Sequence, residues 1–255
     1  MNENKPVCVI VPDIHGRTFW KDVDQYDCDI IFLGDYLDPY PFEGINNKDA
    51  LENFKEIIEY MHGHENATFL LGNHDLEYMI GTYICDCRRD YWNYNEIRDL
   101  FRENSDNFKL AVKRNYGNVD YLFSHAGLHP NWLEKYEGAI DLDYILDWKY
   151  INPDDPNTEP ESTNDIFNFN NALADMSRFR GGYGNIASIV WSDMREWEGI
   201  TTDDGLHQIV GHTYLKSSPI GNDSITCLDC RRIFVIDNNG NICEKDMNPI
   251  EKITF

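Results

Sequence analysis

The stretch Val7-Cys8-Val9-Ile10-Val11-Pro12-Asp13-Ile14-His15 decides how the first half of the chain is expected to fold. Residues 7–11 form an uninterrupted apolar run rich in β-branched side chains, a pattern typical of a strand buried on both faces. Asp13 and His15 follow at once, where the strand ends and a loop begins. Ligand sites in open α/β sheets lie outside the carboxyl ends of the strands. The stretch therefore predicts a parallel sheet with a polar site at one edge.

Four further short polar motifs follow along the chain. They are Gly34-Asp35-Tyr36-Leu37-Asp38, Gly72-Asn73-His74-Asp75, Ser124-His125-Ala126-Gly127 and Gly211-His212-Thr213. Strands are expected just before them, at residues 30–33, 68–71, 119–123 and 207–210. Apolar residues recur at helical spacing over residues 51–61, between the second and third strands. This alternation of strand, helix and strand predicts an α/β fold with a parallel sheet.

The rest of the chain is expected to belong to the same single domain, residues 1–255. The acidic, aromatic-rich segment 131–180 is interpreted as an insertion or cap, with helices near 142–150 and 165–176. Three prolines separate these helices and indicate a loop. Further strands are expected at 188–191, 224–228 and 233–236. A hairpin turn is expected at Asn238-Asn239-Gly240-Asn241.

Composition excludes several classes of partner. The 255 residues carry a formal net charge of -23, whereas nucleic acids and anionic membranes call for a basic surface. No segment approaches the ~18 apolar residues of a membrane span, and residues 1–5 do not resemble a secretory signal. Seven cysteines without such a signal favour a reducing cytoplasm. Cys85 with Cys87 and Cys227 with Cys230 leave a structural zinc site open, although ordinary reduced thiols are the preferred interpretation.

The motifs supply the ligands of two metal ions. The first ion is expected to take Asp13, His15 and Asp35, and the second Asp35, Asn73, His125 and His212. Two divalent ions, two aspartates and a bridging hydroxide leave a net charge of about +1, which favours a phosphate dianion. Mixed nitrogen and oxygen ligands suit Mn, Fe or Zn. The sequence therefore predicts a dimetal phosphoesterase in which the bridging hydroxide attacks phosphorus directly.

His74 stands beside a ligand without being needed as one, so it is expected to act as the general acid that protonates the leaving oxygen. Asp38 is expected to accept a hydrogen bond from the other ring nitrogen and to fix its tautomer. The substrate is expected to be a phosphomonoester, such as phosphoserine or phosphothreonine in a protein. Two alternatives stay open: hydrolysis of a dinucleoside polyphosphate or another small phosphoanhydride, and a non-catalytic binding scaffold.

These motifs resemble the calcineurin-like metallophosphoesterases, and most closely their phosphoprotein-phosphatase branch. Ser124-His125-Ala126-Gly127 and Trp191-Ser192-Asp193 strengthen the resemblance to that branch. It implies a four-layer α/β-β/α sandwich, a dimetal centre, a histidine proton donor and arginines that clamp phosphate. Pro39 follows Asp38 where the branch usually has Arg-Gly, so one clamping arginine is displaced. Arg195 and Arg180 are the expected replacements, because a guanidinium binds phosphate bidentately.

Overall fold

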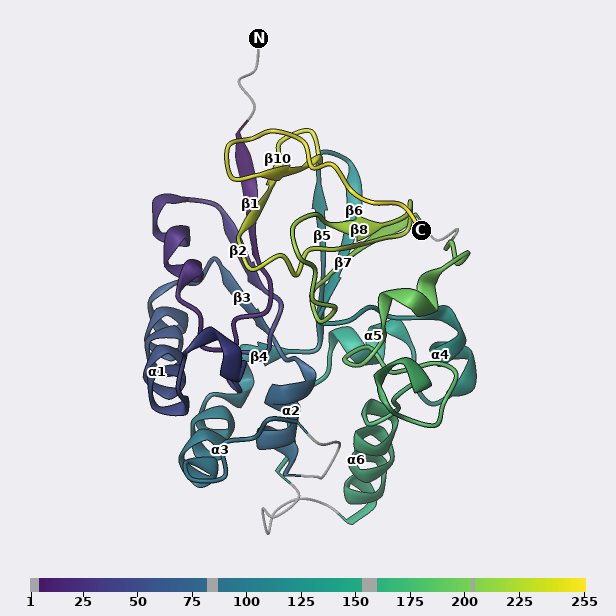
Figure 1. The fold of residues 1–255 in the computed structure, drawn as a ribbon. Helices are drawn as coiled ribbons and strands as arrows, with labels where there is room; N and C mark the ends of the chain where they lie inside the picture. Colours follow the sequence, from purple (N-terminus) through teal and green to yellow (C-terminus); the bar gives the residue numbers. More distant parts are fainter. Residues whose placement is uncertain (1–4, 82–86, 153–159, 203–204) are drawn as a thin grey trace.

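The strands of the computed structural model form two sheets, and the structure describes residues 5–81, 87–152, 160–202 and 205–255 (Figure 1). The first sheet has the order β11 (Ile242–Glu244), β10 (Phe234–Asp237), β1 (Pro6–Val11), β2 (Asp29–Phe32), β3 (Ala67–Leu70) and β4 (Phe108–Lys109). The second has the order β5 (Ala111–Tyr116), β6 (Val119–Ser124), β7 (Leu206–Val210), β9 (Ile225–Cys227) and β8 (Ile220–Gly221). Strands β1 to β4 are parallel to one another, as are β6, β7 and β9.

Strand β1 is buried on both faces, as its apolar run predicts. Val9 and Val11 pack among the residues that bind the first sheet to its helices. Cys8 and Ile10 point the other way, into a cluster shared with residues of the second sheet such as Phe123. Because side chains alternate across a strand, a continuous apolar run can fill both layers at once. The core between the two sheets therefore begins at the N-terminal strand.

Helices lie outside the two sheets. The helices α1 (Asn47–Gly63), α2 (Asn73–Ile80) and α3 (Tyr94–Glu103) gather beside the first sheet, and α4 (Pro130–Lys135), α5 (Leu142–Leu146) and α6 (Pro160–Leu173) on the opposite side (Figure 1). Short 3₁₀ helices are η1 (Phe19–Gln25), η2 (Pro41–Glu43), η3 (Ser105–Asn107), η4 (Arg178–Arg180) and η5 (Met194–Trp197). The predicted α/β-β/α sandwich is confirmed. In the described ranges, no helix combines the length and apolarity needed to cross a membrane.

Several elements differ from the sequence expectations. Residues 188–191 form a turn in which the Trp191 N–H donates to the Ser188 carbonyl at 3.0 Å, so the predicted strand is wrong. A short buried apolar run alone does not distinguish a strand from other buried backbone. α5 ends at Leu146, before the expected 150, and α6 spans 160–173 where 165–176 was expected. The hairpin turn at 238–241 joins β10 and β11 as predicted.

Candidate metal centre

The polar motifs meet because strands from both sheets end at the same edge. Four site residues have left-handed backbone: His15 (φ 45°), Asp35 (φ 53°), Asp38 (φ 59°) and His212 (φ 63°). Non-glycine residues adopt this conformation rarely, and they concentrate at functional sites. The loops also approach closely, since a Cβ on Gly34 would stand 2.4 Å from the Gly72 backbone nitrogen. Glycine at position 34 is thus required for the loops after β2 and β3 to meet.

The first predicted ligand group lies after β1 and β2. His15 Nε2 is 3.4 Å from Asp35 Oδ2 and 4.0 Å from Asp13 Oδ2. The other ring nitrogen of His15, Nδ1, lies 2.8 Å from the Leu37 carbonyl oxygen. When Nδ1–H donates to that carbonyl, Nε2 presents its lone pair to the two carboxylates, as a metal-ligating histidine does. The structure therefore brings together all three predicted ligands of the first ion.

The second group joins both sheets. His125 Nε2 is 3.1 Å from Asn73 Oδ1, 3.1 Å from His212 Nδ1 and 3.5 Å from Asp35 Oδ2. Nδ1 of His125 lies 2.8 Å from the Leu33 carbonyl oxygen, which again leaves Nε2 as the free lone pair. Asp35 borders both groups. The four residues predicted to hold the second ion are thus adjacent in space.

This donor set fits metal ions. All six predicted ligands are buried. Four of them, His15, Asp35, His125 and His212, belong to side-chain groups whose ligand atoms lie within 4.8 Å of one another. Within the described residues, Nε2 of His212 is buried and has no hydrogen-bond partner. Buried lone pairs that face one another are costly unless a proton or a cation lies between them. The side chains of Asp35, His125 and His212 form one compact group, and those of His15, Asp35 and His74 form another.

Protonation states also suit ligation. Burial holds the pKa values of His15 and His212 well below the usual histidine range, so both imidazoles are neutral. Burial raises the pKa of Asp13 to about 6. At Asp35 burial acts in the same direction, but the neighbouring histidines overcome it and lower the pKa to about 2. Metal ligands must be deprotonated, and three of these four groups are so throughout the neutral range.

His74 lies close to His15 and Asp35 but differs from the predicted ligands in having a carboxylate partner, Asp38. His74 Nδ1 lies 2.7 Å from Asp38 Oδ2, and the Tyr78 hydroxyl donates to Asp38 Oδ1 at 2.6 Å. Burial opposes the charged imidazole, yet Asp35 and Asp38 together raise the pKa of His74 to about 9. Tyr78 was not identified from the sequence. Its signal was available, because it stands four residues after His74 on the same face of α2.

Asp75 is a second residue to which the sequence assigned no role. Its carboxylate accepts backbone N–H groups from Asp35 at 2.7 Å, Gly72 at 2.8 Å and Tyr36 at 3.0 Å. Burial and the charge of Asp35 raise the pKa of Asp75 to about 7. The side chain therefore ties the loop after β2 to the start of α2. It positions Asp35 and Asn73 without facing the ligands itself.

A pocket of about 470 Å³ opens over four of the predicted metal ligands. Its lining residues are His15, Asp35, Tyr40, Asn73, His74, Cys87, Arg88, Met176, Arg180, Gly181, Trp191 and His212. Arg88 was not identified from the sequence. Its Nη2 donates to the Asp38 carbonyl at 3.0 Å, and its guanidinium carbon is 3.7 Å from the centre of the Tyr40 ring. Its Nε is buried without a hydrogen-bond partner in the described part of the chain.

The two arginines expected from the sequence occupy different places. Asp193 pairs with both, at 2.8 Å from Arg180 Nε and 2.7 Å from Arg195 Nε. Arg180 lines the pocket and donates to the Thr213 hydroxyl at 2.8 Å. Arg195 has a side chain that is 60% exposed and is absent from the described pocket lining. The structure thus places Arg180 and Arg88 at the pocket, and Arg195 behind Asp193.

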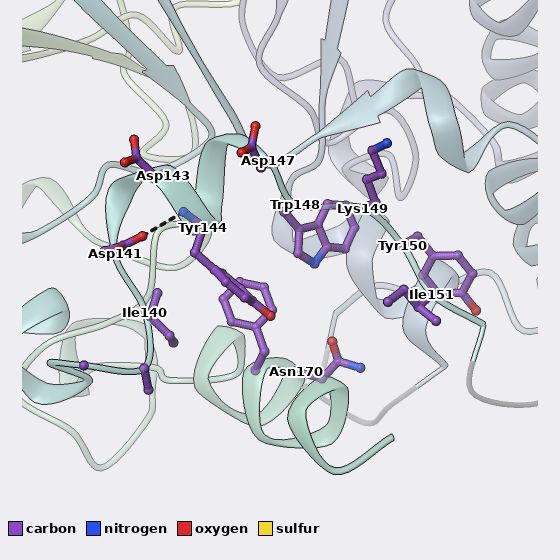
Figure 2. A pocket seen from close by; sticks show the side chains of 13 residues that line it. Ile140, Asp141, Asp143, Tyr144, Asp147, Trp148, Lys149, Tyr150, Ile151 and Asn170 are labelled. Carbon is purple, nitrogen blue, oxygen red and sulfur yellow. Dashed lines mark hydrogen bonds between the residues drawn. The ribbon is translucent and has the colours of Figure 1, made fainter. Parts of the chain in front are cut away.

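Neither the cavity between α5 and α6 nor the cysteine pairs show a group of potential metal ligands in the described residues. A larger cavity of about 590 Å³ lies between α5 and α6, and Figure 2 shows Tyr144 and Trp148 beside it. Its described lining contains no histidine or cysteine. The zinc interpretation finds no support in the described residues, where neither potential metal group includes a cysteine. Cys85 lies outside them, and Cys227 donates to the Gly211 carbonyl at 3.0 Å.

The two-sheet sandwich, with predicted aspartate, histidine and asparagine ligands near its strand ends, is the arrangement expected of a phosphoesterase. The chain belongs to the calcineurin-like phosphoesterase family, whose sequence model matches residues 9–216. The fold is similar to that of a cold-active protein-tyrosine phosphatase from a psychrophilic Shewanella species, with a TM-score of 0.55 and 15% identity over 91% of this chain and 75% of that one. A second structure described as a cold-active protein tyrosine phosphatase gives a TM-score of 0.51 and 15% identity, over 94% and 80%. A comparison with curated proteins gives no significant match.

Proposed function

We propose that this protein is a phosphatase that uses two divalent metal ions to hydrolyse phosphomonoesters. One observation carries the proposal. Four of the predicted ligands, His15, Asp35, Asn73 and His212, line one pocket together with two arginines and His74, which is paired with Asp38. Ligands, an acid and anion-binding groups are the parts that hydrolysis of a phosphoester needs.

Each side chain has a defined task in this proposal. Asp13, His15 and Asp35 would hold one ion, and Asp35, Asn73, His125 and His212 the other. When bound, the two ions, Mn, Fe or Zn, supply positive charge and an activated water for direct attack on phosphorus. His74 donates its Nε2 proton to the leaving oxygen, while Asp38 stabilises the charged ring through Nδ1.

The phosphoryl oxygens are bound by Arg88 and Arg180. Both line the pocket, and a guanidinium fork matches phosphate oxygens. Arg88 thereby replaces the arginine that is absent after Asp38, where Pro39 stands. Its guanidinium is already anchored at the Asp38 carbonyl. Arg195 contributes through Asp193, which it shares with Arg180.

The wider assignments stay proposals as well. The resemblance to the phosphoprotein-phosphatase branch favours a phosphorylated protein as substrate. A single domain is supported by Met176 and Arg180, since the segment 131–180 contributes these residues to the pocket wall. We propose a cytoplasmic location without a nucleic-acid or membrane partner, on the basis of the reduced cysteines and the net charge of -23.

The test combines metal analysis with a substrate panel on one preparation. The protein is loaded with Mn and assayed on p-nitrophenyl phosphate, phosphoserine, phosphothreonine and phosphotyrosine peptides and diadenosine polyphosphates. We expect two metals per chain and turnover of monoesters. Preference for the polyphosphates would replace the proposed substrate class by a phosphoanhydride. Full metal loading with no turnover of any substrate would contradict the enzyme and favour a binding scaffold.

A further inference from the structure

Three aromatic rings and one guanidinium form a continuous surface beside the metal pocket. We call it the aromatic wall, and its members are Tyr40, Phe42, Tyr214 and Arg231. The Tyr40 and Phe42 rings are 5.3 Å apart. The guanidinium carbon of Arg231 lies 4.1 Å from the Tyr214 ring centre, 5.7 Å from that of Phe42 and 5.8 Å from that of Tyr40. Arg231 therefore joins the three rings into one surface.

The aromatic wall starts inside the pocket and runs outward. Tyr40 lines the pocket, and its ring meets that of His15 edge-on at 5.0 Å. Phe42 and Tyr214 lie further out, with 74% and 47% of their surfaces exposed. The aromatic wall therefore extends from the pocket lining at Tyr40 to the exposed rings of Phe42 and Tyr214.

Ion pairs hold the wall in place. Glu43, next to Phe42, pairs with Arg231 at 2.6 Å and with Arg17 Nε at 2.8 Å. Arg17 in turn donates to the Asp13 carbonyl at 3.3 Å, in the loop of the first ligand group. The pairs of Glu43 are mostly buried, so the wall is fixed to the metal-binding loop. These ion pairs fix the guanidinium of Arg231 beside the three rings, so Arg231 loses little side-chain freedom when a ligand binds.

We infer that the aromatic wall is a stacking subsite for a flat aromatic ring of the substrate. The inference rests on the proposed function and adds to it the chemistry of the group that carries the phosphate. Aromatic rings pair with one another in offset or edge-on geometry, and a guanidinium stacks on a ring face. The wall offers both kinds of partner. The ring can be the phenol of an aryl phosphate or the base of a nucleotide.

The experiment compares Phe42→Ala with wild type on four Mn-dependent reactions. The substrates are phenyl phosphate, a phosphotyrosine peptide, adenosine 5′-monophosphate and the alkyl reference β-glycerophosphate. We expect the ratio of kcat/KM for a ring-bearing substrate to that for β-glycerophosphate to fall about three- to tenfold in the variant. Trp92→Ala is the matched control, since Trp92 is 96% exposed and lies outside the wall. It should leave that ratio as in wild type.

The outcomes separate the two proposals. A fall in this kcat/KM ratio that is confined to phenyl phosphate and the phosphotyrosine peptide would mean that the stacked ring is the leaving group itself. A fall confined to adenosine 5′-monophosphate would mean that the stacked ring is a base one sugar away from the phosphate. Hydrolysis of β-glycerophosphate with equal ratios in Phe42→Ala and wild type would overturn the stacking subsite alone. A metal-loaded wild type that hydrolyses no substrate would overturn the phosphatase, and the subsite with it.

Discussion

The floor of the site pocket and its rim are built in different ways. The floor consists of the six predicted metal ligands and His74, all within four residues of the end of a strand. Five of these seven residues line the pocket, and Asp13 and His125 lie beside them. The rim consists of Arg88, Arg180, Tyr40 and Trp191, which stand on loops or in a short 3₁₀ helix. Floor positions are fixed by where the strands end, and rim positions by which long side chains reach the pocket. The strand ends thus position the groups proposed for the chemistry, whereas loops position the groups proposed to bind the substrate.

The largest effect is expected at the floor. His74→Asn removes the proton donor but leaves the ligands, so kcat should fall about 10²- to 10⁴-fold with two metals still bound. Turnover and metal content are measured on the same sample. His207→Asn is a suitable control, because His207 does not line this pocket. Its Nδ1 lies 2.9 Å from the Asp223 carbonyl oxygen. Undiminished turnover in His74→Asn would remove His74 from the reaction.

Substitutions at the rim should reduce activity less than substitutions at the floor, and they should act by weakening substrate binding. Arg88→Ala removes one charge-assisted contact to phosphate, so kcat/KM should fall about 10- to 100-fold. Arg195→Ala should change it by less than about threefold, because its side chain is exposed and lies behind Asp193. Steady-state kinetics on p-nitrophenyl phosphate compare the two variants. A larger loss of kcat/KM in Arg195→Ala than in Arg88→Ala would place Arg195 at the phosphate, as the sequence predicts.

Protonation of Asp13 should make metal binding at the floor depend on pH. Asp13 has a pKa raised to about 6, so below pH 6 it must lose a proton before it binds metal. His15 and His212 have lowered pKa values and are neutral there, so they release none. Mn affinity should therefore fall about tenfold per pH unit below pH 6, measured by titration calorimetry from pH 5 to 7. A decline in Mn affinity of a hundredfold or more per pH unit would mean that the imidazoles of His15 and His212 are also protonated.

Metal removal should produce the smallest effect, on stability. Ions at one hundred times their Kd stabilise the folded state by about 2.7 kcal/mol. For a chain of this size, chelation should then lower Tm by roughly 5–10 °C. Calorimetry before and after chelation measures the shift, and Arg88→Ala should show the same shift because the rim binds no metal. An equal Tm in both states after verified metal removal would contradict a structured metal centre at the floor.

The sequence predicted the floor because each of its residues is local to a strand end. Buried apolar runs locate β1, β2, β3, β6 and β7, and parallel strands bring their carboxyl ends together. Elements without such a run were missed, among them β4, with two residues, and α4, with six. The turn at 188–191 was misassigned because its apolar residues are buried for tertiary reasons alone. Local sequence patterns therefore predicted the main strands better than the helices and loops that cover the sheets.

The packing of distant segments determines which arginines face the pocket. Arg88 and Arg195 have equally long side chains, and no spacing in the sequence ranks them. Asp193 holds Arg195 on its exposed side, while Arg88 packs on Tyr40 and bonds the Asp38 carbonyl. These contacts join residues far apart in the chain, so they exist only once the sheets and loops have packed. The sequence is therefore enough to predict the metal ligands, whereas the residues around the proposed phosphate site depend on the packing of distant segments.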